Sequence, residues 1–408
     1  MVHQHRIRKP GAWLPADHRV HREYLSRVTH HVDSHAAEEL TPALREFRQL
    51  IEGNARIYMY FVQMFDEMPR KHPYWRDPAG TRQVRDYEHM LRVLNHIVTR
   101  ASWASRCVPF STTPWLRRGN VPVPSEVCCC SDPEFRRGAL KKVLNEWGKY
   151  LQTPESAAVL GDHAGGWFGE AGMKDMLQVA NAPYKSSMRF DDMFVCDPSA
   201  KHMGFASWDG KSLNMEHGVK LRDRFFAKGQ PYSLLDMLAH DPLAREFAGG
   251  TVYQAFLSAL SHHRWHSPVS GTVRRAFVED GTYFSEPLFE GVGDPAVHEI
   301  DTRGITVAQG YLSAMATRAI IVLEADNPRI GLLAFVGIGM DEVSTCEITV
   351  DEGQHLEKGQ DLGMFHFGGS SHCLIFQNGV RMEGFPVVGR EENVPARGKL
   401  AVLKPQGS

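Results

Sequence analysis

The sequence reads Phe365-His366-Phe367-Gly368-Gly369-Ser370-Ser371 near its C-terminal end, with two glycines directly before a serine. Glycine has no Cβ, so Gly368 and Gly369 can adopt strained or positive-φ conformations that bring the Ser370 hydroxyl against the Gly369 carbonyl. An acyl shift from nitrogen to oxygen can follow, and the resulting ester can eliminate across Cα and Cβ of Ser370. The dehydroalanine left at the new N-terminus hydrolyses to a pyruvoyl group with loss of ammonia.

A pyruvoyl group is an electrophile that the chain makes from itself. Its ketone can form a Schiff base with a substrate amine and accept the electrons released when a carboxylate leaves. Gly-Gly-Ser-Ser is also ordinary turn composition. On this segment alone, self-cleavage and a plain loop both remain open.

A second motif lies upstream and reads His262-His263-Arg264-Trp265-His266-Ser267-Pro268. Together the two motifs resemble the phosphatidylserine decarboxylase superfamily, in which a His-Arg-x-His-x-Pro segment supplies the histidine that activates the serine of a Gly-Ser-Thr or Gly-Ser-Ser cleavage motif. Further matches extend this resemblance over most of residues 200–385 and include Lys228-Gly229, Asp280-Gly281-Thr282 and Lys358-Gly359-Gln360-Asp361.

A narrower resemblance is to the soluble fungal members of the psilocybin-pathway type, which decarboxylate L-tryptophan and related aromatic amino acids. It rests on a Tyr-His-Arg-Trp-His-type segment at His262–His266 and on three longer strings of sequence: IVLEADN at 321–327, GMDEVSTCE at 339–347 and GMFHFGGSS at 363–371. This resemblance implies that the substrate is an aromatic L-amino acid.

The resemblance also implies the roles of individual residues. Ser370 would become the pyruvoyl group, and cleavage between Gly369 and Ser370 would leave chains of residues 1–369 and 370–408, with Gly368 and Ser371 as the supporting loop. His266 would be the general base, since a histidine with a pKa of about 6.5 can take a proton from serine at neutral pH. His263 would protonate the substrate carbon after carbon dioxide has left.

The acid of the expected serine, histidine and aspartate set is where this chain departs from the family pattern. Family members carry an Asp-Phe-Phe-x-Arg type segment and later Ala-Asp-Gly, whose aspartate orients the histidine, whereas residues 204–210 read GFASWDG here. Asp209 is our predicted carboxylate, because it could hold His266 in the correct tautomer. Capping a turn before glycine is its alternative role, and Glu216 and Asp223 are reserve candidates.

Composition narrows the class of protein. A chain of 408 residues with 42% hydrophobic content can bury more than one core. A net charge of −2 gives no support for a nucleic-acid partner.

The cysteine content indicates the compartment. Seven cysteines without a Cys-x-x-Cys pair indicate a reducing compartment. With neither a signal peptide nor a membrane span in the sequence, we expect a cytoplasmic protein with no stable membrane anchor. The chemistry requires no metal.

Hydrophobic periodicity divides the chain into two parts. Apolar stripes predict helices over residues 41–53, 86–101 and 132–151. Later runs predict strands at 271–277, 318–323, 330–336, 345–350 and 373–376, with Asn378-Gly379 as a hairpin turn. We therefore predict an α+β protein, with a helical N-terminal domain over residues 1–160. An antiparallel, barrel-like β-rich catalytic domain of phosphatidylserine decarboxylase type would follow over 161–408.

The predicted function is self-processing, pyruvoyl-dependent decarboxylation of an aromatic L-amino acid, with L-tryptophan as the first candidate. The partners are the amino acid substrate and the protein's own cleaved small chain. Phosphatidylserine decarboxylation is the main alternative. A catalytically idle scaffold and a carrier module, suggested by the turn at Lys358-Gly359, come from other classes of function.

Overall fold

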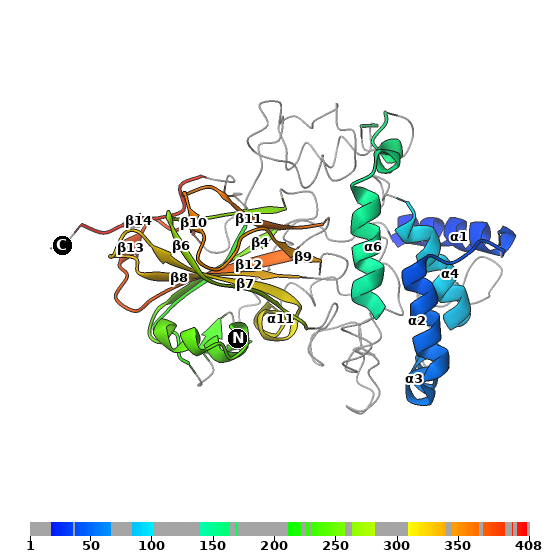
Figure 1. Cartoon of the computed structure of the whole chain (residues 1–408), viewed down its shortest axis with the longest axis horizontal. Coiled ribbons are helices and arrows are strands. Elements are labelled where there is room, and N and C mark those ends of the chain that lie inside the picture. The colour runs from blue at the N-terminus through cyan, green and yellow to red at the C-terminus, as the bar shows by residue number, and fades with distance from the viewer. Residues whose placement is uncertain are drawn as a thin grey trace, which may run out of the picture.

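In the computed structural model the chain forms a group of helices beside a β-rich unit (Figure 1). The structure describes residues 18–35, 37–66, 84–100, 139–162, 168–169, 211–221, 225–227, 230–257, 263–281, 309–339, 345–366, 370–387, 394 and 398–405. Helix α6 lies between the sheets and the other helices of the N-terminal part (Figure 1).

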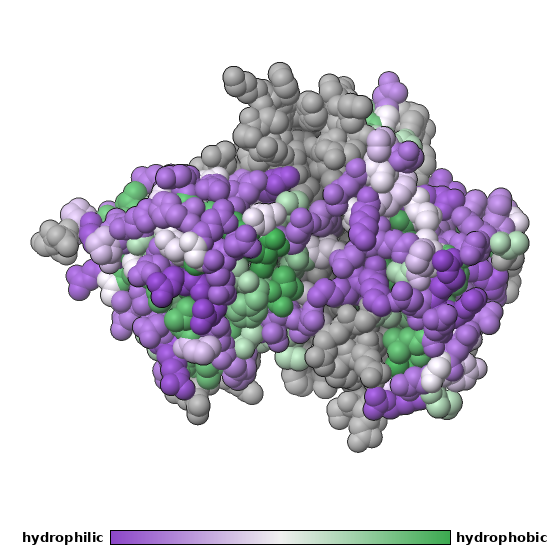
Figure 2. All heavy atoms as spheres, viewed as in Figure 1, coloured by the Kyte–Doolittle hydropathy of each residue, from purple (hydrophilic) through white to green (hydrophobic). Residues whose placement is uncertain are grey.

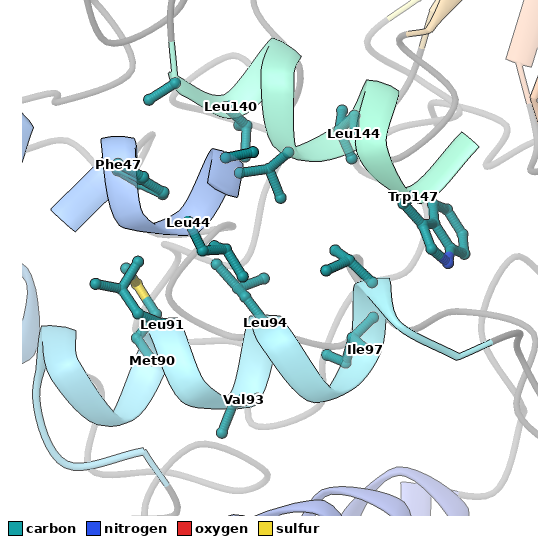
Figure 3. Close-up of a cluster of buried hydrophobic side chains, with 14 of the residues drawn as sticks. Leu44, Phe47, Met90, Leu91, Val93, Leu94, Ile97, Leu140, Leu144 and Trp147 are labelled. Carbon is teal, nitrogen blue, oxygen red and sulfur yellow. The ribbon is translucent and has the colours of Figure 1, made fainter. Parts of the chain in front are cut away.

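The N-terminal helices pack around a single apolar cluster. They are α1 (His18–Ser34), α2 (Pro42–Gly53), α3 (Ala55–Asp66), α4 (Tyr87–Val98) and α6 (Lys141–Leu151), followed by the 3-10 helix η4 (Pro154–Val159). Figure 3 shows Leu44 of α2 and Leu94 of α4 facing one another, while Val93 points to the opposite side of α4. The predicted helices over 41–53 and 86–101 are confirmed as α2 and α4. The third predicted helix is seen from Lys141, and residues 132–138 lie outside the described ranges.

The start of α2 is capped from neighbouring helices. Pro42 occupies the first turn as expected, but the Thr41 side chain makes no capping bond. Instead, the Thr41 N–H donates to Asn95 Oδ1 of α4 at 2.8 Å, and the Ala43 N–H donates to Glu146 Oε2 of α6 at 3.0 Å. Backbone donors that a helix leaves unpaired at its start are thus satisfied by tertiary contacts.

Two histidines of α4 are held in the neutral form. The N–H of Arg85 donates to Nδ1 of His89 at 3.2 Å, so this nitrogen must be unprotonated. Burial, followed by the charge of Arg85, lowers the pKa of His89 to about 4. Burial, followed by the charge of Arg100, lowers the pKa of His96 to about 3.

Acidification is therefore expected to destabilise the helices. Both histidines titrate below the ordinary value of about 6.5, so the unfolded chain binds protons first as the pH falls. Their contribution is fully present above about pH 6.5 and is lost toward about pH 4 for His89 and about pH 3 for His96, with a loss on the order of 3 kcal/mol for His89. Urea unfolding followed by circular dichroism at neutral and acidic pH measures this. The variant His89→Asn should weaken the pH dependence, and an unchanged slope in that variant would contradict the assignment.

The C-terminal part is built on a seven-stranded antiparallel sheet. The strands, in spatial order, are β1 (Lys211–His217), β4 (Thr251–Leu257), β12 (Ser370–Phe376), β8 (Leu332–Ile338), β7 (Arg318–Ala325), β6 (Gly271–Glu279) and β10 (His355–Leu356). A second, three-stranded sheet has the order β5 (Arg264–His266), β11 (Asp361–Phe365) and β9 (Cys346–Ile348). Two-stranded pairs join β2 (Phe225–Ala227) with β3 (Gln230–Tyr232), and β13 (Met382–Glu383) with β14 (Val402–Leu403).

The large sheet is covered on both faces. The short helices α9 (Leu234–Met237), η5 (Pro242–Phe247) and α11 (Gln309–Met315) share one core with it. Side chains of the three-stranded sheet, including Trp265 and Phe365, share the other core. This double burial explains why β7 is a nearly continuous apolar run. The visible surface is mostly hydrophilic, and apolar side chains gather over the region of α11, where Met315 is exposed (Figure 2).

The predicted α+β class is confirmed. Among the described strands the order is open, with β1 and β10 at its edges, so the barrel-like closure stays a prediction, as does the domain boundary after residue 160. The predicted hairpin at Asn378-Gly379 is wrong. The chain turns there, with Gly379 at φ 86°, but the strands on either side of the turn pair with other strands: β12 with β4 and β8, and β13 with β14. Within the described ranges, no helix combines the length and apolar content needed to cross a membrane.

Candidate active site

The predicted cleavage site lies where β11 passes to β12. Strand β11 ends at Phe365, and β12 begins at Ser370. Ser370 stands opposite Leu257 of β4, and from Ser371 onward β12 is also paired with β8. The three residues between His366 and Ser370, which include Gly368 and Gly369, lie outside the described ranges.

The first residues of β12 are oriented by strand alternation. Cys373 and Ile375 belong to the core with α9 and α11, whereas Leu374 and Phe376 belong to the core with β5 and β11. Ser371 is fully buried, and its hydroxyl has no hydrogen-bond partner among the residues that the structure describes.

The predicted histidines lie on or beside β5. His266 is the last residue of this strand, opposite Asp361 of β11. His263 is fully buried, and its carbonyl accepts a hydrogen bond of 3.0 Å from the N–H of Phe365. The segment that contains both histidines is therefore paired with the strand that leads into the cleavage segment.

A bulge sets the register between β5 and β11. The pairing shifts between Asp361 and Gly363, and Gly363 adopts φ 153°. A Cβ at Gly363 would lie 2.2 Å from the carbonyl oxygen of Glu347, so glycine is required where β9 passes this close. The bulge places Asp361 directly beside His266.

Asp361 is the carboxylate in contact with His266. Asp361 Oδ1 lies 2.9 Å from His266 Nδ1, and its Oδ2 accepts a hydrogen bond from Arg264 Nη1 at 3.0 Å. Partial burial raises the pKa of Asp361, but the hydrogen bond from His266 and the charges of His266 and Arg264 outweigh it, so the pKa lies below its usual value. A carboxylate this close to Nδ1 favours the tautomer in which Nε2 carries no proton and can accept one, which is the arrangement of catalytic triads.

The aromatic residues of the two motifs have a packing role. Trp265 packs edge-on against Phe365, with ring centroids 4.6 Å apart, and against Phe335 at 5.4 Å. Trp265 is 4% exposed and Phe365 is fully buried. These contacts pack β5 against β11 and against the large sheet. They thereby fix the backbone that carries His263 and His266.

The predicted acids are only partly placed. Asp209 and the reserve candidate Asp223 lie outside the described residues, and Glu216 lies on the edge strand β1 opposite Val252. Asp361 was not among the predicted site residues, although its Lys-Gly-Gln-Asp segment was recognised as a family match. The signal that could have identified it was a carboxylate nine positions before the serine of the predicted cleavage site.

Two family profiles match this chain, both described as phosphatidylserine decarboxylase. One covers residues 41–176 and the other covers residues 195–394. The second match includes both histidines, Asp361 and the Gly-Gly-Ser-Ser segment. The chain belongs to the phosphatidylserine decarboxylase family and is a carboxy-lyase.

Individual members of the family are similar to this chain over much of its length. The chain is 40% identical over 271 residues to decarboxylase iboD of Amanita muscaria, an alignment that covers 58% of this chain and 76% of the relative. It is 30% identical over 415 residues to the L-tryptophan decarboxylase of Psilocybe cubensis, covering 91% of this chain and 89% of that enzyme. The L-tryptophan decarboxylase of Psilocybe cyanescens is also 30% identical, over 90% of this chain and 88% of its own length.

Proposed function

We propose that this chain is a self-processing, pyruvoyl-dependent decarboxylase of an aromatic L-amino acid, with conversion of L-tryptophan to tryptamine as the first candidate reaction. The observation that supports it most directly is the contact between His266 of β5 and Asp361 of β11, the strand that leads into the Gly-Gly-Ser-Ser segment. The substrate class is supported by the relatives. Two L-tryptophan decarboxylases align with 91% and 90% of the chain, whereas phosphatidylserine decarboxylase proenzymes align with 38% to 58% of it.

The first reaction is carried out by the chain on itself. His266 accepts the proton of Ser370 Oγ, which attacks the carbonyl carbon of Gly369, and the amide nitrogen leaves as an amine when the ester forms. Removal of the α-proton of residue 370 then expels the Gly369 carboxylate from Cβ. The dehydroalanine tautomerises to an imine, and water replaces its nitrogen, which leaves as ammonia. Asp361 stabilises the imidazolium of His266 during the first step.

The surroundings of position 370 fit a pyruvoyl group at the start of β12. The group would be covalently attached to a strand that the sheet holds on both sides, next to Ser371. The buried hydroxyl of Ser371 has no partner among the described residues and can donate a hydrogen bond to a carbonyl oxygen. Such a ketone supplies an electrophile for a substrate amine and a sink for the electrons released with carbon dioxide. His263, buried beside β11, would return a proton to the substrate carbon. Asp209 stays a prediction as a further acid.

Phosphatidylserine decarboxylation is the second candidate, because the family profile that covers the site carries that description. Both candidates require the same cleavage between Gly369 and Ser370. They differ in the molecule that must reach the ketone, which is an amphiphile at a lipid surface in one case and a free amino acid in the other.

Two measurements on purified full-length protein test the proposal. Intact mass spectrometry should find a chain of residues 1–369 and a pyruvoyl-started chain that ends at residue 408. Carbon dioxide should be released from L-tryptophan and not from phosphatidylserine vesicles. Release from the vesicles alone would replace the first candidate with the second. An intact chain without decarboxylase activity would refute both and favour an idle scaffold.

A further inference from the structure

A second histidine and carboxylate pair lies at the other end of β11. His366 directly follows this strand and stands three positions before Gly369. Its Nε2 lies 2.5 Å from Glu347 Oε2 of β9, and the imidazole side chain is 9% exposed. The hydrogen bond from His366 lowers the pKa of Glu347, partial burial opposes this, and the charges of His366 and Arg264 add to the lowering. Neither residue has a role in the chemistry described above.

The two pairs belong to one sheet and share an arginine. Met364 of β11 stands opposite Arg264 of β5 on one side and opposite Glu347 of β9 on the other. Arg264 bonds to Asp361, and its charge lowers the pKa of both carboxylates. The pair of His266 and Asp361 therefore marks the start of β11, and the pair of His366 and Glu347 marks its end.

Helix α6 covers the end of β11. A Cβ built on Gly148 of this helix would lie 3.6 Å from Cγ of His366, so the imidazole packs directly over the glycine. Met364 is buried in the core of the N-terminal helices, while its neighbour Phe365 is buried in the core of the sheets. In Figure 1, α6 is the N-terminal helix nearest the sheets. The last residues before the cleavage segment are thus fixed from β9 and from α6.

We propose that His366 and Glu347 are positioning residues for self-cleavage, an inference that rests on the proposed function. Residues 367–369 connect two anchored points, namely His366 at one end and β12, paired with β4 from Ser370, at the other. His266 and Asp361 act on the serine hydroxyl, whereas His366 and Glu347 fix the chain on the carbonyl side of the bond. A part-buried, charge-assisted hydrogen bond between a buried imidazole and a half-exposed carboxylate suits this task because it is strong and directional. Misplacement of reacting groups by about 1 Å can cost about 100-fold in rate.

The test compares cleavage rates of matched variants of the full chain. His366→Ala and Glu347→Ala are expected to split about 10-fold to 100-fold more slowly than the unaltered protein. Glu347→Gln retains an oxygen that accepts the hydrogen bond, so it should recover part of the rate. The control is His355→Ala, because His355 of β10 also pairs with a carboxylate, Asp326, at 3.0 Å, but its imidazole is 51% exposed, whereas that of His366 is 9% exposed. The control should split at the unaltered rate.

A second measurement separates positioning from a general structural role. Once the slow variants have split, their kcat per pyruvoyl-bearing chain should equal that of the unaltered protein, because the pair acts before the cofactor exists. Unaltered splitting rates in folded His366→Ala and Glu347→Gln would overturn the inference. A kcat that falls along with the splitting rate would also overturn it. If the unaltered protein itself never splits, the proposed function fails instead, whatever the variants do.

Discussion

Ser370→Ala is expected to leave a single chain of 408 residues with no decarboxylase activity. Alanine has no nucleophile to attack Gly369, so neither the ester nor the ketone can form. The substitution removes one oxygen at the start of β12, which pairs with β4 through its backbone, so the fold should be preserved. Denaturing electrophoresis and intact mass spectrometry over the period in which the unaltered protein splits completely give the result.

Ser370→Cys is the matched variant for this experiment. It keeps a nucleophile at the same atom position, so the chain should still split, at a different rate. If Ser370→Ala splits at the same bond, another group attacks Gly369 and the role of Ser370 is misassigned. If neither variant folds, as judged by circular dichroism, Ser370→Thr retains the hydroxyl and supplies the comparison.

Asp361→Asn is expected to slow self-cleavage by about 100-fold to 10,000-fold. An amide lacks the charge that stabilises the imidazolium of His266, and its NH₂ can donate to Nδ1 and select the wrong tautomer. The bond to Arg264 also loses its charge partner. Because the pKa of Asp361 is lowered, its carboxylate persists at neutral pH and is lost only as the pH falls through that lowered value. The rate of chain splitting, measured by electrophoresis, gives the effect.

Two further variants decide which acid serves His266. Asp326→Asn alters the exposed pair with His355 and should leave the splitting rate unchanged. Asp209→Asn tests the aspartate predicted from the sequence. If Asp209→Asn splits slowly while Asp361→Asn splits at the unaltered rate, then Asp209 is the orienting acid and Asp361 is a structural partner of Arg264.

The elements that could be predicted from sequence are those with strong local signals. The apolar stripe of α2, with Pro42 in its first turn, and the runs of β7 and β8 were identified with bounds that differ by a few residues. The short strands β5 and β10 were not predicted, because two or three residues cannot establish a period of two. The turn at Asn378-Gly379 carries a hairpin signal, but the pairing of β12 with β4 and β8 overrides it.

The site could be predicted in part for the same reason. Two short motifs can be recognised directly in the sequence, and they contain Ser370, His266 and His263. Asp361 meets Arg264 across 97 positions, through a register shift that no local pattern encodes. The pair of His366 and Glu347 likewise depends on how β9 and α6 pack against β11. The sequence therefore shows His366 only as one residue of the GMFHFGGSS segment and does not indicate its partner.

The place of β12 between β4 and β8 has a consequence for the processed enzyme. Cleavage at Ser370 would make β12 the first segment of a separate polypeptide. Backbone hydrogen bonds to β4 on one edge and to β8 on the other would still hold that segment in the sheet. The two products should therefore co-migrate through every non-denaturing column as an obligate heterodimer. After denaturation, recovery would become a bimolecular event whose yield rises with concentration, whereas the unsplit Ser370→Ala protein would refold at a rate independent of dilution.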